Sequence, residues 1–148
     1  MPKPSKVHPL STADAAYVAG LIDGEGSISL TRRHSNEQRQ LVVSISNTEL
    51  PLLEYTHKAI GAGKITGKRT YKNHHATGYT YSIANRQALA LLAQVQPYLR
   101  SYKSKRSGLV LHNYLRLTPR NGKYTPQLLA ERALFENEFL RTTAGLDI

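Results

Sequence analysis

The sequence predicts an α+β fold in which two β-hairpins form one four-stranded antiparallel sheet, with helices before, between and after them. Three observations lead to this prediction. Segments with helical spacing alternate with segments of period two, in the order αββαββα followed by further helices. The 148 residues suit one domain with a sizeable core. The chain has no cysteine, which excludes a disulfide framework and a thiolate metal site.

The first half of the chain predicts a helix and a hairpin. Residues 1–10 contain three prolines and are expected to form an irregular arm. A helix follows over residues 12–22, because Ser11 and Asp14 have the spacing of a capping box. From Ser27 polar and apolar residues alternate, up to residue 33 and again at 40–45, around a polar turn. This alternation predicts a hairpin with one apolar face.

The next segment predicts a second helix and a second hairpin. Thr48 is the expected N-cap of the helix, and Gly61 is its expected end. The hairpin has alternating residues from Lys64 to residue 71 and again at 79–83, where Tyr79 and Tyr81 are expected to face the helices.

The last third predicts helices. Asn85 is the expected cap of a helix that ends near Pro97. Two more helices are predicted at about 107–117 and at 127–141, the latter opened by Thr125 and Pro126. We therefore divide the chain into an arm (1–10), a main domain (11–118), and a C-terminal loop and helix (119–148) packed on that domain.

The charge distribution points to a polyanionic partner. The net charge is +10, and the 76 residues between Glu54 and Glu131 contain 13 Lys or Arg and no Asp or Glu. Such a stretch repels itself unless phosphates neutralise it. No apolar run approaches the roughly 18 residues that span a bilayer, and the start has no apolar region of a signal peptide, so no membrane partner is expected. The lack of cysteine also fits an intracellular protein.

The polar face of the predicted sheet offers candidate DNA contacts. Any half-exposed sheet has a polar outer face, but this one lacks Asp and Glu, which favours nucleic acid. The candidate DNA-binding residues are Ser29, Thr31, Arg33, Gln38, Gln40, Ser44, Lys64, Thr66, Lys68, Thr70, Thr80 and Ser82.

Two carboxylates lie where a helix end disfavours them. Asp23 and Glu25 follow the first predicted helix, at the negative end of its dipole. Together with the unpaired carbonyls of a helix end they form an all-oxygen cluster, the ligand type that Mg²⁺ prefers. The alternative is that Asp23 only hydrogen-bonds the turn and Glu25 is simply exposed.

The ten residues from Tyr17 to Gly26, YVAGLIDGEG, resemble the signature of the LAGLIDADG homing endonuclease family, in its homodimeric, single-motif type. Gly24 and Glu25 are the two departures from that signature, where the family usually has Ala and Asp. The αββαββα order is also the family's, so the resemblance covers most of residues 12–118. It implies a homing-endonuclease-like domain whose four-stranded sheet forms a saddle over DNA.

The resemblance also implies roles for particular residues. Glu25 would be the catalytic acid and the ligand of a Mg²⁺ cofactor, with the carbonyl of Gly24 as a second ligand. Asn47 matches the polar residue that orients a water. Lys103 is the best match to the basic residue near the cut, with Tyr102 and Lys105 as alternatives.

The resemblance further implies that two signature helices pack side by side in a homodimer, with Ala16, Gly20 and Asp23 at the dimer interface. One chain carries one signature, whereas a double-strand break needs two cuts. We therefore expect a homodimer that cleaves double-stranded DNA at a long, near-palindromic site, with Arg33, Lys64 and Lys68 contacting bases or phosphates. The alternatives are a non-catalytic relative, such as an intron maturase or a DNA-binding regulator, and a basic RNA-binding protein.

Overall fold

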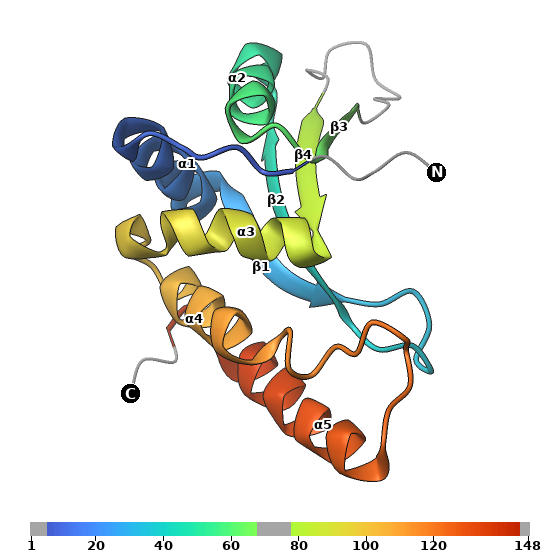
Figure 1. The fold of residues 1–148 in the computed structure, drawn as a ribbon. Helices are drawn as coiled ribbons and strands as arrows, with labels where there is room; N and C mark the ends of the chain where they lie inside the picture. The colour runs from blue at the N-terminus through green and yellow to red at the C-terminus, as the bar shows by residue number, and fades with distance from the viewer. Residues whose placement is uncertain (1–5, 68–77, 146–148) are drawn as a thin grey trace.

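The computed structural model describes residues 6–67 and 78–145, and it confirms the predicted α+β class and the order of elements (Figure 1). The elements are α1 (Thr12–Glu25), β1 (Gly26–Thr31), β2 (Gln40–Asn47), α2 (Leu50–Ile60), β3 (Lys64–Gly67), β4 (Tyr79–Ala84), α3 (Asn85–Val95), a 3₁₀ helix η1 (Gln96–Tyr98), α4 (Lys103–Asn113) and α5 (Pro126–Arg141). None of the helices in these two ranges is long and apolar enough to cross a membrane.

The four strands form one antiparallel sheet in the order β1-β2-β4-β3. Alternate strand residues are buried, among them Ile28, Leu30, Val43 and Tyr81, and they pack under the helices on one face of the sheet (Figure 1). The hydroxyl of Tyr81 donates a hydrogen bond of 2.6 Å to the carbonyl of Ala62. Among the described residues, no helix covers the other face of the sheet (Figure 1).

Several predicted element ends are confirmed. The side chain of Ser11 accepts a hydrogen bond of 3.1 Å from the backbone N–H of Asp14, and Thr125 caps α5 in the same way. Gly61 ends α2 with a φ of 79°, a left-handed conformation that glycine adopts without strain. The first helix runs three residues further than predicted, through Glu25, so that both carboxylates of the signature belong to its last turn.

Three predicted starts are wrong. Thr48 does not cap α2. The N-cap of this helix is Glu49, and the backbone N–H of Glu49 donates to the side-chain oxygen of Asn47. Asn85 does not cap α3: it is the helix's first residue, with a φ of 54°, and its side chain accepts from the hydroxyl of Tyr114. The fourth helix begins at Lys103, four residues before the predicted start, because the segment before it is fixed by tertiary contacts described below.

The described part of the N-terminal arm has neither helix nor strand, yet it is packed on the domain. The N–H of His8 donates to the carbonyl of Ile60 at 2.7 Å. The side-chain amide of Gln94 accepts from the N–H of Leu10 and donates to the carbonyl of His8. Two α3-to-arm hydrogen bonds therefore hold residues 8–10 in place.

A buried arginine attaches α5 to the rest of the fold. Arg132 is 1% exposed. Its guanidinium donates to the carbonyls of Leu117 and Arg39, to the hydroxyl of Thr118, and to the carboxylate of Glu136. A single side chain thus connects α5 with the start of β2 and with the loop after α4.

Candidate active site and nucleic-acid interface

The structure brings two of the predicted catalytic residues together. Glu25 ends α1 and Asn47 ends β2, and the side-chain N–H of Asn47 donates a hydrogen bond to the carboxylate of Glu25. The carboxylate is exposed. Because the Asn47 oxygen accepts from the N–H of Glu49 at 2.8 Å, the amide is fixed in the orientation that directs its N–H groups at Glu25.

Lys103 contacts the backbone of the helix end that carries Glu25. Its side chain is 8% exposed, and its ammonium donates to the carbonyls of Ile22 at 2.9 Å and Asp23 at 2.8 Å. These carbonyls belong to the last turn of α1, which has no basic residue of its own. Lys103 therefore supplies the positive charge that the helix dipole favours at this end. Burial lowers the pKa of Lys103, and the nearby Asp23 carboxylate opposes that effect.

Asp23 completes a reciprocal clasp between α1 and the segment before α4. Its carboxylate accepts hydrogen bonds from the N–H of Arg100 at 2.7 Å and from the N–H and hydroxyl of Ser101. The helix end that carries Glu25 is thus held by two sets of long-range hydrogen bonds. Asp23 accepts from residues 100 and 101, and Lys103 donates to the carbonyls at the end of α1. The carboxylate of Asp23, predicted at a dimer interface, is directed at its own chain.

The Asp23 contacts predict a dependence of stability on acid. Burial raises the pKa of Asp23, but the hydrogen bonds from Ser101 and Arg100 outweigh it and leave the pKa below its ordinary value of 3.8. A lowered folded-state pKa gives stability that is present above pH 3.8 and lost as the pH falls through the folded-state value. The melting temperature of the wild type should therefore fall more steeply below pH 4 than that of Asp23→Asn.

The matched control for this prediction is Glu138→Gln. This exposed side chain accepts no hydrogen bond from a described residue, so the variant should follow the wild-type acid profile. Parallel profiles for wild type and Asp23→Asn would contradict the role assigned to the clasp.

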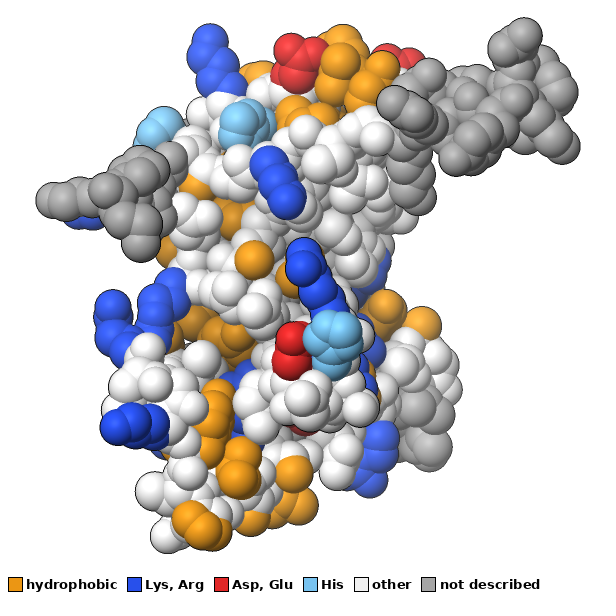
Figure 2. All heavy atoms as spheres, turned by 90° about the vertical axis from the view of Figure 1, so that its right-hand side faces the viewer, with side chains coloured by type: hydrophobic (Ala, Val, Ile, Leu, Met, Phe, Trp, Pro, Cys, Tyr) orange, Lys and Arg blue, Asp and Glu red, His pale blue; other side chains and the backbone are white. Residues whose placement is uncertain are grey.

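The outer face of the sheet gathers most of the predicted DNA-binding residues. Cross-strand neighbours Ser44, Ser82 and Lys64 form one row across β2, β4 and β3, and Ser46, Thr80 and Thr66 form the next. The predicted Ser29, Thr31 and Gln40 lie on the same face in β1 and β2. No strand of the sheet contains Asp or Glu. Figure 2 shows the side of the molecule that lies on the right in Figure 1, where uncharged polar and backbone atoms cover much of the surface and few acidic groups interrupt it.

Hydroxyl pairs organise this face. Ser27 and Ser44 are joined by a hydrogen bond of 2.8 Å, and Ser46 and Thr80 by one of 2.9 Å. A hydroxyl has one donor and two acceptor positions, so each retains capacity for base edges or phosphates. Ser27 and Ser46 are absent from the predicted set, although the same alternation that selects Ser29 and Ser44 would have found them.

Four predicted DNA contacts lie off the described strands. Arg33 and Gln38 belong to the loop between β1 and β2, because β1 ends at Thr31. Arg33 is therefore not a strand residue, contrary to prediction. Lys68 and Thr70 lie outside the described residues.

The predicted dimer face of α1 is uncovered in the single chain. Ala16, Gly20 and Gly24 are exposed, and a Cβ added at either glycine would meet nothing within 4 Å. Tyr17 is 44% exposed, and its ring meets that of Tyr55 edge-on at 5.9 Å.

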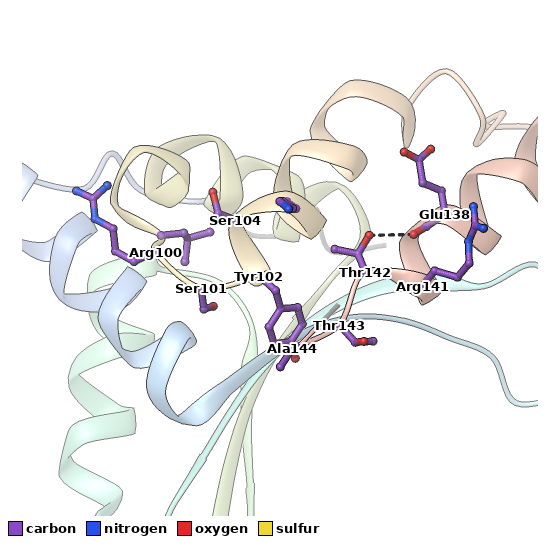
Figure 3. A pocket seen from close by; sticks show the side chains of 12 residues that line it. Arg100, Ser101, Tyr102, Ser104, Glu138, Arg141, Thr142, Thr143 and Ala144 are labelled. Atoms are coloured by element: carbon purple, nitrogen blue, oxygen red, sulfur yellow. Dashed lines mark hydrogen bonds between the residues drawn. The ribbon is translucent and has the colours of Figure 1, made fainter. Parts of the chain in front are cut away.

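The cavities do not include the carboxylate site. A cavity of about 880 Å³ lies between the start of α4 and the segment after α5, with Arg100 and Arg141 at opposite ends (Figure 3). Tyr102, one of the alternatives to Lys103, points into the same region. Neither Glu25 nor Asn47 lines a described cavity. Their site is an open surface, which suits a large substrate better than a small molecule.

Comparison with known proteins agrees with this arrangement. A sequence profile described as LAGLIDADG endonuclease matches residues 18–116, more than half of the chain. The comparison with curated proteins found no match.

Solved structures share the fold at low sequence identity. The homing endonuclease I-CvuI in complex with its target has 21% identity and a TM-score of 0.71, with 92% of this chain and 85% of that chain covered. The archaeal intron-encoded homing endonuclease I-Vdi141I in complex with DNA has 16% identity and a TM-score of 0.59, with 90% and 86% covered. The meganuclease I-SmaMI bound to DNA has 20% identity and a TM-score of 0.61, with 93% and 48% covered. Because the profile matches more than half of the chain, from the second half of α1 through the sheet to the end of α4, the chain belongs to the LAGLIDADG endonuclease family.

Proposed function

We propose that the protein is a homodimeric homing endonuclease that makes a double-strand break in a long, near-palindromic DNA site with the aid of a divalent cation. The observation that carries the proposal is the exposed Glu25 carboxylate, oriented by Asn47, at one end of a sheet face without acidic residues. The known structures that share this fold include I-CvuI, I-Vdi141I and I-SmaMI with DNA.

The residues at the end of α1 fit a hard cation such as Mg²⁺. Glu25 offers carboxylate oxygens, and Gly24 offers a carbonyl in the last helical turn, where carbonyls lack helical donors. No group of three or more acidic or His side chains in residues 6–67 and 78–145 could hold a metal ion. One chain thus gives few ligands, and scissile phosphates, water and a second chain would supply the others. A bound divalent cation provides positive charge that stabilises the transition state of phosphodiester hydrolysis.

The protein groups around the cation site have distinct tasks. Asn47 holds the Glu25 carboxylate, and its other N–H can orient a water molecule. Lys103 and Asp23 fix the helix end from behind, so that Glu25 and Gly24 keep their positions when a duplex approaches. Within this proposal Lys103 acts as a positioning residue, supported by its contacts with the carbonyls of Ile22 and Asp23.

The homodimer is supported by the uncovered face of α1. A glycine in the middle of a helix costs about 1 kcal/mol relative to Ala, and no atom of the residues that the structure describes lies within 4 Å of a Cβ added at Gly20. A second helix could use that space for close approach, with Ala16 beside it. The structural match with I-SmaMI includes 93% of this chain but only 48% of I-SmaMI. By length, that larger protein could therefore hold a second copy of the fold.

The experiment that tests the proposal is selection of cleaved duplexes from a randomised DNA library, with Mg²⁺, with Ca²⁺ and with a chelator. We expect cleaved sites with two-fold symmetry in Mg²⁺, no cleavage in the chelator, and a solution mass of two chains. A wild-type protein that cleaves no duplex but binds RNA tightly would contradict the proposal and support the maturase or RNA-binding alternative. A monomeric mass on cleaved DNA would contradict the dimer alone.

A further inference from the structure

A second cavity, of about 750 Å³, opens at the end of the sheet opposite to Glu25. The start of β2 and the residues before it, the junction of β4 with α3, and the loop between α4 and α5 form its walls. Four arginines line it, and no acidic residue does; they are Arg39, Arg86, Arg120 and Arg132. A concave surface with one sign of charge concentrates the electric field and favours a counter-ion.

Two of these arginines share one carboxylate within the fold. Glu136 accepts from Arg132 at 2.9 Å and forms an ion pair of 3.5 Å with Arg39. Arg39 also donates to the carbonyl of Leu30. This network, in which only Arg132 is fully buried, forms part of the wall and leaves a net positive charge, because one carboxylate faces two guanidinium groups.

The other two arginines keep unused donors. A guanidinium has five N–H groups. Arg86 makes one long hydrogen bond, of 3.4 Å, to the carbonyl of Thr118. Within residues 6–67 and 78–145, Arg120 forms no hydrogen bond or ion pair with another side chain or carbonyl, and it is exposed. Both groups therefore lie at a cavity wall with free donors for a planar or tetrahedral anion.

The cavity adjoins the proposed DNA face. Gln40 and Ala84, which belong to that face, line the cavity together with the loop residue Gln38. Figure 2 shows several basic side chains close together at one edge of the side that it views. β2 runs eight residues from Gln40 to Asn47, which at about 3.3 Å per residue separates the cavity from the Glu25 site by about 23 Å. Along a duplex with about 3.4 Å per step, this corresponds to about seven base pairs.

We propose that this cavity binds a backbone phosphate of the target duplex about seven base pairs outward from the scissile phosphate, with Arg86 and Arg120 as its ligands. The inference rests on the proposed function and adds a contact that fixes the protein's register on DNA. Arg39, Arg132 and Glu136 hold the wall against which the phosphate lies and do not need to contact it.

The test compares Arg86→Gln/Arg120→Gln with wild type in duplex binding at several salt concentrations, in Ca²⁺ where cleavage is not needed. Loss of one phosphate contact should weaken binding about tenfold and make the slope of log affinity against log salt shallower by about 0.9. Arg116→Gln is the matched control, since Arg116 pairs with Glu131 on the surface and does not line the cavity. Its salt slope should remain that of the wild type.

A methylphosphonate scan locates the contact. Neutral substitution five to nine base pairs from the cut should weaken wild-type binding at one position, and the double variant should lose nothing further there. If both proteins lose equal affinity at every position, or if the double variant keeps the wild-type slope, the inference is overturned while the endonuclease stands. If the wild type binds and cleaves no duplex, the proposed function fails, and the phosphate site fails with it.

Discussion

Glu25→Gln should abolish detectable double-strand cleavage, lowering the cleavage rate by about 10²–10³-fold. Gln keeps the length and one oxygen of the side chain, so it can still accept the hydrogen bond from Asn47. It loses the negative charge that a divalent cation requires of its ligand. The measurement is single-turnover cleavage of the selected site in Mg²⁺, with binding followed separately. Duplex affinity should be retained, because the change removes a negative charge near phosphates.

Mixed dimers provide the control for this prediction. A dimer of one wild-type and one Glu25→Gln chain should nick one strand, since in the proposed homodimer each chain would bring one exposed acid to one scissile phosphate. Full double-strand cleavage by Glu25→Gln alone would contradict the catalytic role of Glu25. Loss of duplex binding together with cleavage would assign Glu25 to the fold or the interface instead.

Arg132→Met should lower the free energy of unfolding by about 3–5 kcal/mol, because it removes one partner of a buried ion pair. The carbonyls of Leu117 and Arg39 would lose the donor that Arg132, 1% exposed, provides, and Glu136 would keep only its 3.5 Å ion pair with Arg39. For a chain of this size, such a change corresponds to a decrease of about 10 °C in the melting temperature. The measurement is urea unfolding supported by a thermal scan.

Arg116→Met is the matched control, because its ion pair with Glu131 is exposed. It should cost less than about 1 kcal/mol. Arg132→Lys should lie between the two, since one ammonium cannot replace a planar group that reaches four partners. Equal stability of Arg132→Met and wild type would contradict the view that this side chain attaches α5 to the sheet.

Most of the fold was predictable because it depends on local periodicity. Period-two alternation located both hairpins, and the polar residues at 29, 31, 44, 80 and 82 lie on the face where alternation places them. Capping by Ser11 and Thr125 was also predictable, since a cap and its N–H are three residues apart. The wrong caps, Thr48 and Asn85, have the right chemistry, but the neighbouring Asn47 accepts the hydrogen bond at the start of α2, and the side chain of Asn85 accepts from the distant Tyr114.

The candidate active site was predictable in part. The acidic helix end and the family resemblance pointed to Glu25, and the resemblance alone pointed to Asn47; the structure places the two side chains in contact. The resemblance pointed to Lys103 in the basic segment after α3, but it did not predict which groups the Lys103 ammonium contacts. Its ammonium lies on the carbonyls of Ile22 and Asp23, eighty-one and eighty residues away along the chain, so no local pattern encodes the contact.

The sequence by itself determined the class of fold, the polar sheet face without acidic residues, and the family signature, because each depends on residue type and short-range spacing. Only the tertiary structure decided that Lys103 and Asp23 clasp the helix end, that Arg132 is buried, and that four arginines surround one cavity. These arrangements join residues from distant parts of the chain, and a charge in a sequence does not reveal whether folding will bury it, pair it or leave it open to a phosphate.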